Sequence, residues 1–278
     1  MSKTTQPTHF FQYENGSWKD HDSYTITETS VALTVNGQVW LSFMCTPADL
    51  EALAIGFLFN EGMITSMQEI ADVRVCQHMD NVDVWTNVPL ERPANWRRTS
   101  GCTGGQTSVE AEPELTVLPQ LYNGALLSPE TVLDLVNSLF ESQDLYRLSG
   151  GVHTSALTDC QGTFISAEDI GRHNTLDKIA GKCLMQNIQL QRRVIITTGR
   201  ISSEMLQKAA RLGTAVLISR TSPTSLSIKM ALRYGITLIG YARRDRFKVY
   251  SHPERIINTP IKTKSQSIKT KIKQNAAP

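Results

Sequence analysis

Three short apolar runs in the carboxyl-terminal half constrain the fold more than any other feature of this sequence. They occupy residues 194–196, 215–218 and 236–239, and a capped helical pattern ending at Gly213 or Gly235 separates each run from the next. Uninterrupted apolar strands that alternate with helices are typical of a parallel sheet with both faces covered. The sequence therefore predicts a three-layer α/β unit.

Further elements of this unit precede the three runs. A helix is predicted to begin after Ser128, which has the form of a cap, and residues 150–170 have the pattern of a hairpin. Residues 174–185 again have helical spacing. We assign residues 125–258 to this second domain.

The amino-terminal part has a different pattern. Alternating apolar residues over 25–43 are interrupted by Asn36-Gly37, the strongest short signal for a tight hairpin. Alternation returns over residues 69–88 and predicts two more strands. Residues 1–95 are therefore predicted to form a small N-terminal α+β domain, and the fold class of the whole chain is α/β.

One helix is predicted between these strands. Thr46 has the form of its cap and Pro47 that of its first residue, because proline is favoured at the first helical position. Apolar residues then recur at helical spacing up to Gly62, which is predicted to end the helix. This helix is expected to cover one face of the small sheet.

A segment without periodicity, residues 96–124, joins the two predicted domains and carries Cys102. Long loops of this kind are often functional, so we predict a mobile loop. Arg97 and Arg98 stand close to Cys102, and neighbouring cations lower the pKa of a thiol. An exposed thiolate can carry sulfur as a persulfide, although an incidental surface cysteine is the alternative.

The other four cysteines, Cys45, Cys76, Cys160 and Cys183, stand in or beside apolar segments and are predicted to be ordinary semi-buried thiols. No two of the five cysteines have C-x-x-C spacing. This spacing argues against both a zinc ribbon and a disulfide framework. We expect reduced thiols.

The charge distribution argues against nucleic acid as the main ligand. The chain carries +2 at pH 7, but five lysines lie in the acid-free segment 259–278, so the remainder carries about −3. The segment 259–278 is predicted to be a disordered, solubilising tail. No apolar run is long enough for a membrane span and the start does not resemble a signal peptide, so we expect a cytoplasmic protein.

Three strand-to-helix loops offer a site for a phosphate-bearing ligand. They are "TTGRISSE" (197–204), "SRTSPTS" (219–225) and "GYARRDR" (240–246). Ligands of open α/β sheets gather beyond the carboxyl ends of the strands, where helix amides point outward. Guanidinium groups pair with phosphate oxygens, and Tyr241 could stack on a base. The alternative is that each loop merely caps its helix.

A second polar cluster precedes a predicted helix and contains Glu168, Asp169, Arg172 and His173. It could support acid–base chemistry or hold a metal, but a structural ion-pair network is the favoured interpretation. A zinc deaminase needs H-x-E followed by P-C-x-x-C, and the sequence has neither, so no metal site is expected. His153 could equally be a strand-edge residue or a ligand-binding one.

Six stretches together resemble the formate dehydrogenase accessory sulfurtransferase family (FdhD): "ALAIGFLFNEGMI", "RTSGC", "GGVHTSAL", "AEDIGRHNTLDKIAG", "TTGRISSEMLQKAARLG" and "YSHPERI". The resemblance extends over residues 23–257. It implies a cytidine-deaminase-like C-terminal domain without the zinc site, and a cytoplasmic homodimer. It also implies transfer of sulfur from a cysteine desulfurase to the molybdenum bis(molybdopterin guanine dinucleotide) cofactor, which formate dehydrogenase requires.

The resemblance also assigns site residues. Cys102 matches the first cysteine of the family's S-C-G-x-C-G loop and becomes the catalytic persulfide carrier, while Gly105 stands where the second cysteine would be. That departure puts a two-cysteine mechanism in doubt. The segment that binds the cofactor in the family falls on Tyr241, Ala242, Arg243, Arg244, Asp245 and Arg246, and relatives can have Pro-Gly where this chain has Arg-Asp.

Two other classes of function are consistent with the residues. A purely non-covalent chaperone would bind and deliver the cofactor, and Cys102 would then be dispensable. A deaminase or other nucleotide-modifying enzyme is suggested by the fold alone, which is weak evidence for function.

Overall fold

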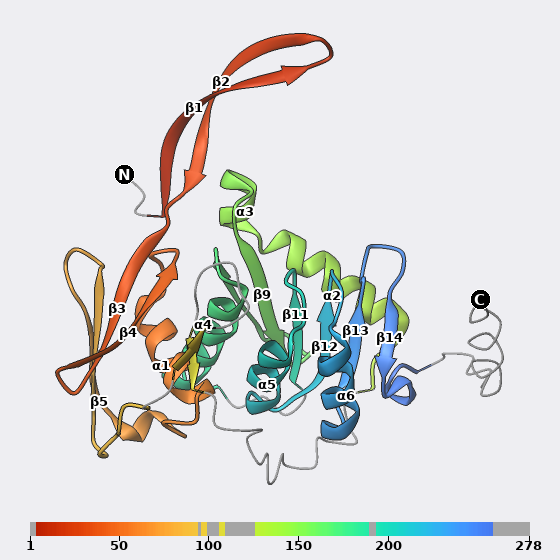
Figure 1. The fold of residues 1–278 in the computed structure, drawn as a ribbon. Coiled ribbons are helices and arrows are strands. Elements are labelled where there is room, and N and C mark those ends of the chain that lie inside the picture. Colours follow the sequence, from red (N-terminus) through yellow and green to blue (C-terminus); the bar gives the residue numbers. More distant parts are fainter. Residues whose placement is uncertain (1–3, 94–95, 99–105, 109–125, 189–192, 258–278) are drawn as a thin grey trace, which may run out of the picture.

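Two sheets of different construction dominate the computed structural model, which describes residues 4–93, 96–98, 106–108, 126–188 and 193–257 (Figure 1). The smaller sheet has the order β4-β3-β6-β5 and the larger has the order β10-β9-β11-β12-β13-β14. The strands of the smaller sheet are β3 (Thr29–Val35), β4 (Gln38–Cys45), β5 (Ile70–Val75) and β6 (Asn81–Thr86). Those of the larger are β9 (His153–Thr158), β10 (Phe164–Asp169), β11 (Arg193–Thr197), β12 (Thr214–Ser219), β13 (Thr237–Gly240) and β14 (Lys248–Ser251).

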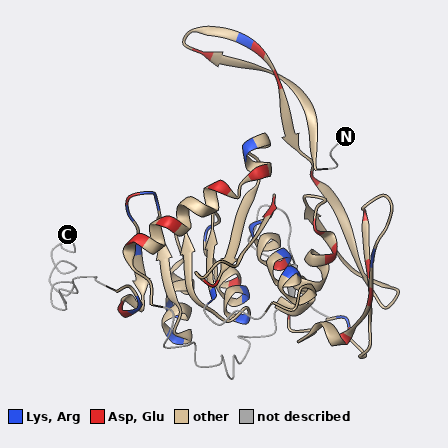
Figure 2. Cartoon of the chain, turned by 180° about the vertical axis from the view of Figure 1, so that it is seen from behind, with Lys and Arg blue, Asp and Glu red and all other residues tan. Residues whose placement is uncertain are grey.

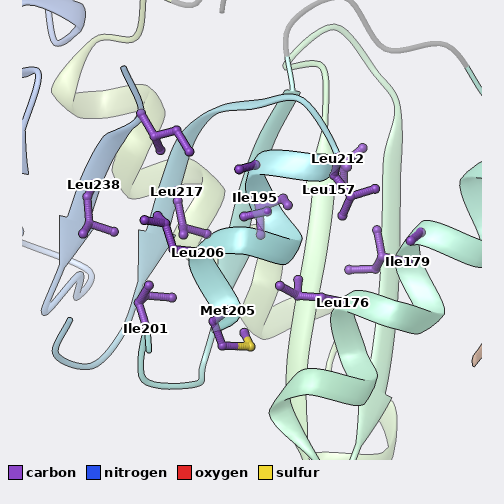
Figure 3. Close-up of a cluster of buried hydrophobic side chains, with 14 of the residues drawn as sticks. Leu157, Leu176, Ile179, Ile195, Ile201, Met205, Leu206, Leu212, Leu217 and Leu238 are labelled. Carbon is purple, nitrogen blue, oxygen red and sulfur yellow. The ribbon is translucent and has the colours of Figure 1, made fainter. Parts of the chain in front are cut away.

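The larger sheet confirms the predicted three-layer α/β unit. Strands β11, β12 and β13 run parallel, while β9 and β14 are antiparallel to their neighbours. One face packs on α4 (Arg172–Met185), α5 (Ser203–Arg211) and α6 (Ser225–Tyr234), with the side chains shown in Figure 3. The other face packs on α2 (Pro129–Glu141). The centres of the three strands are apolar because both of their faces are buried.

The smaller sheet contains the hairpin predicted at Asn36-Gly37 and the two later strands. It packs on α1 (Leu50–Asn60), but this helix begins later than predicted. The residue before its start, Asp49, is left-handed (φ 53°), and Thr46 is not a cap. Instead, the Thr46 amide donates to Asp169 Oδ2 at 3.1 Å, so a contact with the other sheet's unit overrides the local capping signal.

Helices α1 and α4 cross so closely that only glycine fits at the crossing. A Cβ atom added to Gly56 would lie 1.7 Å from the Asp177 carbonyl oxygen, and one added to Gly181 would lie 1.9 Å from the Ala52 carbonyl oxygen. Both distances are far below any van der Waals contact. We call this crossing the seam, together with the buried charged residues around it, Asp169, Asp177, Lys178 and Lys208. The seam joins the two sheets.

A long hairpin that the sequence analysis did not anticipate extends from the body. Strands β1 (Thr5–Glu14) and β2 (Ser17–Ile26) pair along their whole length and rise above the larger sheet (Figure 1). The turn residues Asn15 (φ 51°) and Gly16 (φ 82°) both have positive φ, as a tight hairpin turn of the mirror-image type requires. We call this hairpin the arm. Its Asn-Gly signal is the same one that predicted the β3–β4 turn.

The base of the arm contacts the larger unit. Ile26 lies against Gly151, where an added Cβ would be 2.9 Å from an Ile26 methyl group, and β2 also contacts α3 (Asp144–Ser149). The arm therefore starts beside the beginning of β9. Two 3₁₀ turns, Met67–Glu69 and Pro253–Arg255, complete the elements of the two units.

Part of the predicted mobile loop is also described. β7 (Trp96–Arg98) pairs antiparallel with β8 (Gln106–Ser108). Cys102 and Gly105 lie outside the described residues, and so does the predicted tail from residue 259. Within the described ranges, no helix is long and apolar enough to cross a membrane.

Candidate functional site

A cavity of about 440 Å³ opens at the carboxyl edge of the parallel strands. Because β9 is antiparallel to β11, its amino-terminal end lies at the edge where β11, β12 and β13 end. The topology thus brings together residues at the ends of five strands, β9 to β13, and from the helical segment before β9. The lining residues are Gln143, Tyr146, Gly150, Gly151, Val152, His153, Ile170, Thr198, Arg220, Thr221 and Arg243.

Two arginines give the cavity its charge. Arg243 donates from Nη1 to the carbonyl oxygens of Arg220 and Ala242, and the Arg220 guanidinium lies over the Phe140 ring, 4.0 Å from the centroid. Within the ranges the structure describes, neither arginine has a carboxylate at ion-pair distance. Burial lowers the pKa of Arg220, and the charge of Arg243 acts in the same direction.

The Nε atom of Arg220 is buried and makes no hydrogen bond in the structure. A buried donor without a partner is costly, as are two neighbouring cations. An anionic ligand would relieve both costs at once, and phosphate oxygens match guanidinium donors in geometry. The residues present therefore fit a phosphate-bearing ligand.

His153 supplies a neutral polar group to the same cavity. Burial lowers its pKa, and the charge of Arg172 adds to the shift. Its Nδ1 lies 3.3 Å from Thr198 Oγ1, which also accepts a hydrogen bond from the Thr154 amide at 3.0 Å. Either His153 Nδ1 or the Thr198 hydroxyl is the donor in this bond, depending on the tautomer of the imidazole. His153 lines the cavity, so it is placed to contact a ligand as a hydrogen-bonding group.

The six residues predicted to bind the cofactor lie in different surroundings. Of these, Arg243 lines the cavity. Tyr241 is part-exposed with φ 53° and has Lys248 Nζ 4.6 Å from its ring centroid, while the Ala242 side chain is fully buried in the core beneath α2. Arg244 lies 5.4 Å from the Phe140 centroid, and Arg246 pairs with Asp245 at 3.8 Å on the surface.

The Glu168–His173 cluster is structural in the contacts it makes. Glu168 accepts from the amides of Leu145 (2.7 Å) and Tyr146 (3.1 Å), so it holds the first turn of α3 beside the cavity. Asp169 is fully buried and pairs with Lys178 at 2.6 Å. The favoured interpretation of this cluster as an ion-pair network is correct for Asp169, with Lys178 as the partner.

The network continues through the seam. Lys178 also donates to the carbonyl oxygens of Thr46 (3.1 Å) and Glu168 (3.2 Å). Further along α4, Asp177 accepts two hydrogen bonds of 2.7 Å from Lys208 and one of 2.7 Å from Asn60. Burial raises the pKa of Asp177. These charged side chains are therefore bonded within the protein, where they join the two units.

His173 is buried beside the network. Its Nε2 lies 3.4 Å from Ser202 Oγ and 3.4 Å from Glu204 Oε2. Burial holds its pKa well below the usual range, and the charge of Lys208 adds to the effect. His173 therefore contacts the start of α5. Across the described ranges, no group of three or more His, Cys, Asp or Glu residues is arranged to hold a metal ion.

The described thiols differ sharply in their surroundings. Cys45 is buried and its pKa is raised to about 12, chiefly by burial and then by the charge of Asp169. Burial also raises the pKa of Cys183. Cys76 is partly buried and donates to Asp80 at 2.8 Å. Cys160 was predicted to be semi-buried, and this is wrong: it is exposed at the β9–β10 turn, where its φ is 59°.

Several lining residues were missed by sequence reasoning. Gln143 comes from the α2–α3 connection and Tyr146 from α3, where the sequence shows an ordinary helical pattern, so no local signal marks them. Gln143 is held in place by its amide, which donates to Thr154 Oγ1 at 3.0 Å. Thr198 and Arg220, by contrast, lie in the strand-to-helix loops that the sequence had indicated.

Comparison with known proteins places this chain in a family. A model of the FdhD/NarQ family matches residues 26–257. The chain belongs to this family. It is 34% identical over 251 residues to a protein named sulfur carrier protein FdhD from Staphylococcus aureus (strain MRSA252), covering 89% of this chain and 95% of that one. It is also 34% identical over 257 residues to the protein of the same name from Bacillus subtilis (strain 168), covering 91% and 98%.

A solved structure supports the fold assignment within the family. The crystal structure of a protein from Desulfotalea psychrophila, described as a formate dehydrogenase accessory protein, superposes with a TM-score of 0.71 at 29% identity. The match covers 91% of this chain and all of that one. The mixed α/β fold predicted from the sequence is thus confirmed.

Proposed function

We propose that this FdhD/NarQ family member is a cytoplasmic, homodimeric sulfur carrier. It takes sulfur from a cysteine desulfurase and passes it to the molybdenum bis(molybdopterin guanine dinucleotide) cofactor, which formate dehydrogenase then receives. The cofactor is a substrate here. The observation that carries the proposal is the cavity with the orphaned Arg220 Nε, in a chain whose relatives are named sulfur carriers.

Cys102 is the proposed carrier. Its thiolate attacks the terminal sulfur of the desulfurase persulfide, a new S–S bond forms, the donor's S–S bond breaks, and the donor cysteine leaves as a thiolate. The described thiols support this choice by contrast, because the raised pKa values of Cys45 and Cys183 make them poor nucleophiles at neutral pH. One carrier suffices for one sulfur atom, so Gly105 in place of a second cysteine is compatible with transfer.

The dinucleotide arms of the cofactor are proposed to bind at the carboxyl edge. Arg220 and Arg243 would pair with phosphate oxygens. Tyr241, on the rim of this edge, would stack on a guanine base. His153 would contribute a neutral hydrogen-bonding group.

A non-covalent cofactor chaperone is the second candidate. The observation that favours it is that, among the residues that the structure describes, the cavity is lined by polar and cationic groups of the α/β unit that fit a phosphate-bearing ligand. In this case the site would hold and deliver the dinucleotide, and the thiol would be dispensable.

One experiment separates the two candidates. The protein is incubated with a cysteine desulfurase and cysteine, and the mass of each cysteine peptide is measured. A sulfur adduct is expected on Cys102, and Cys102→Ala should abolish maturation of formate dehydrogenase in cells lacking the wild-type protein. Cys160→Ala is the matched control, because Cys160 is an exposed thiol on another loop. If Cys102→Ala still matures the enzyme, sulfur carriage by this residue is rejected in favour of the chaperone.

The binding site is tested with guanosine diphosphate as the probe. Arg243→Gln should weaken binding at least tenfold, since a hydrogen bond to a charged group contributes about 1.5–3 kcal/mol. Arg74→Gln, on β5 of the other sheet, is the control and should leave binding unchanged. Equal affinities of the wild type and Arg243→Gln, measured by native mass spectrometry, would show that the phosphates bind elsewhere.

A further inference from the structure

An aromatic ring lies against two of the arginines at the carboxyl edge. Phe140 is in the last turn of α2, and its ring centroid is 4.0 Å from the Cζ atom of Arg220 and 5.4 Å from that of Arg244. Arg220 follows β12, and Arg244 belongs to the β13–β14 loop, residues 241–247. Figure 2 shows Lys and Arg residues, in blue, gathered in that loop. The ring therefore contacts cations that come from two different connections of the larger sheet.

These cations lie close enough to act on one another. Burial lowers the pKa of Arg220, and the charges of Arg243 and Arg244 both act in the same direction. Arg243 donates from Nη1 to the Arg220 carbonyl oxygen, which holds these two residues together. Like charges at short range repel one another, most strongly where water is excluded. Some attractive contact must therefore keep the guanidinium groups in one place.

Within the described ranges, no carboxylate supplies that attraction. The acid in the same loop, Asp245, pairs with Arg246 at 3.8 Å instead. Glu141 directly follows Phe140 in the sequence, yet it makes no ion pair in the part of the chain that the structure describes. The neighbours of Arg220, Arg243 and Arg244 are carbonyl oxygens and the Phe140 ring.

A ring and a carboxylate act differently on a guanidinium group. The negative face of an aromatic ring attracts a cation but carries no net charge, so the cation keeps its full charge. A carboxylate would neutralise the cation and accept two of its N–H bonds. The buried Nε of Arg220, which makes no hydrogen bond in the structure, agrees with the first arrangement. The ring thus holds the cations while their charge and donors stay available to an anion.

The rest of α2 fixes the ring in place. Val132, Val136 and Leu139 are fully buried in the core beneath the helix, which sets its rotation about its own axis. The Phe140 carbonyl oxygen accepts a hydrogen bond from the Gln143 amide at 3.4 Å, where the chain turns toward α3. The carboxyl end of a helix also carries a partial negative charge, which favours nearby cations. The helix end and the ring therefore attract the arginines together.

We propose that Phe140 is a positioning residue for anion binding, whose ring holds Arg220 and Arg244 in their binding arrangement without neutralising either charge. Phe140 is not among the described residues that line the cavity, so it acts through the arginines. The inference rests on the proposed function only in taking the ligand to be a phosphate-bearing nucleotide. It does not involve Cys102.

The first test removes the aromatic ring in the full-length protein. Phe140→Leu keeps an apolar side chain on α2 and should raise the dissociation constant of guanosine diphosphate about tenfold, measured by isothermal titration calorimetry. Phe140→Tyr keeps a ring and should bind with an affinity close to that of the wild type. Phe164→Leu, the same change on the edge strand β10, is the matched control and should leave the affinity unchanged.

The second test separates positioning from a merely structural role. Phe140→Glu places a carboxylate against the same two guanidinium groups, whereas Phe140→Gln places a neutral side chain of similar size there. Phe140 is only partly buried, so both variants should fold. Phe140→Glu should unfold at the same urea concentration as Phe140→Gln or a higher one, because it can form ion pairs. It should nevertheless bind guanosine diphosphate at least ~10-fold more weakly, because the arginines are neutralised.

Two outcomes overturn the inference and leave the nucleotide site standing. One is equal affinity of the wild type and Phe140→Leu for guanosine diphosphate. The other is a Phe140→Glu variant that binds as tightly as Phe140→Gln, since binding would then be insensitive to a carboxylate beside the arginines.

Inorganic pyrophosphate is the second probe, because it carries phosphates without a nucleoside. If the wild type binds pyrophosphate but not guanosine diphosphate, and Phe140→Leu weakens that binding, the nucleotide of the proposed function is rejected and the role of Phe140 stands. A wild type that binds neither probe overturns both.

Discussion

The seam and the carboxyl edge of the larger sheet contain the same kinds of charged side chain in opposite arrangements. At the seam, Lys178 pairs with Asp169 at 2.6 Å and Lys208 with Asp177 at 2.7 Å. At the edge, Arg220 and Arg243 lie side by side, with carbonyl oxygens and an aromatic ring as neighbours. Buried charges that are paired hold units together, whereas cations that lack a counter-charge in the described protein identify a site for an anion.

The largest effect should come from closing the space at the helix crossing. Gly56→Ala or Gly181→Ala puts a Cβ within 2 Å of a backbone carbonyl oxygen that cannot move away alone. The cost should exceed the usual ~1–3 kcal/mol for overpacking, so we expect little folded protein. In an ordinary helix interior the same change would stabilise by about 0.5–1 kcal/mol. If either variant unfolded at the same urea concentration as the wild type, the two helices would have to lie further apart at the crossing than the structure shows.

The next largest effect should come from breaking a buried pair. Lys178→Met leaves the Asp169 carboxylate buried without its cation and should lower the free energy of unfolding by about 3–5 kcal/mol. Lys182→Met, one turn later on α4, is the control, because Lys182 and its partner Asp49 are part-exposed and such pairs contribute about 0–1 kcal/mol. Equal losses of unfolding free energy in Lys178→Met and Lys182→Met, measured by urea unfolding, would contradict this difference between buried and part-exposed pairs.

The free energy of unfolding should depend on pH through buried histidines at both places, His173 beside the seam and His153 at the carboxyl edge. The folded-state pKa of His173 lies well below 6.5, so below about pH 6.5 the unfolded chain binds a proton that the folded protein does not. Stability should therefore fall as pH drops from about 6.5, by up to ~1.4 kcal/mol per pH unit, and stay constant above it. His153 contributes in the same sense, whereas the raised pKa of Asp177 contributes in the opposite sense.

The variant His173→Gln isolates the contribution of that residue. Its unfolding temperature should depend less on pH between 7.5 and 5 than that of the wild type. Parallel curves for the two proteins would mean that His173 is protonated normally in the folded state.

The smallest effect is expected at the surface of the edge. Arg246→Gln removes an exposed pair with Asp245 at 3.8 Å and should change the free energy of unfolding by less than ~0.5 kcal/mol. Its effect on guanosine diphosphate binding should also be smaller than that of Arg243→Gln, because Arg246 does not line the cavity. A change in Tm of several degrees would instead show that the Arg246 side chain stabilises the folded β13–β14 loop.

Local patterns predicted the elements of this fold well, and long-range contacts explain the exceptions. The parallel strands and the Asn36-Gly37 hairpin follow from apolar runs and turn chemistry. The start of α1 was misplaced because Thr46 is bonded to Asp169, a residue more than a hundred positions away. The arm was missed although Asn15-Gly16 carries the required signal, because its strands are too polar to suggest a core.

The site was predictable only where it lies in strand-to-helix loops. The sequence indicated Thr198, Arg220 and Arg243 because the carboxyl ends of parallel strands share one edge. It could not indicate Tyr146, which is brought to the cavity by the bond from its amide to Glu168. The assignment of Cys102 stays a prediction, since that residue lies outside the described ranges.

The glycine crossing has a consequence for how this protein can be divided. A boundary drawn in the sequence between the two sheets is not a boundary in cooperativity, since Lys178 on one side satisfies its charge with the help of a Thr46 carbonyl on the other. Fragments cut between the sheets would each expose half of a polar interior. The two halves must therefore be exchanged together, in evolution as in protein engineering.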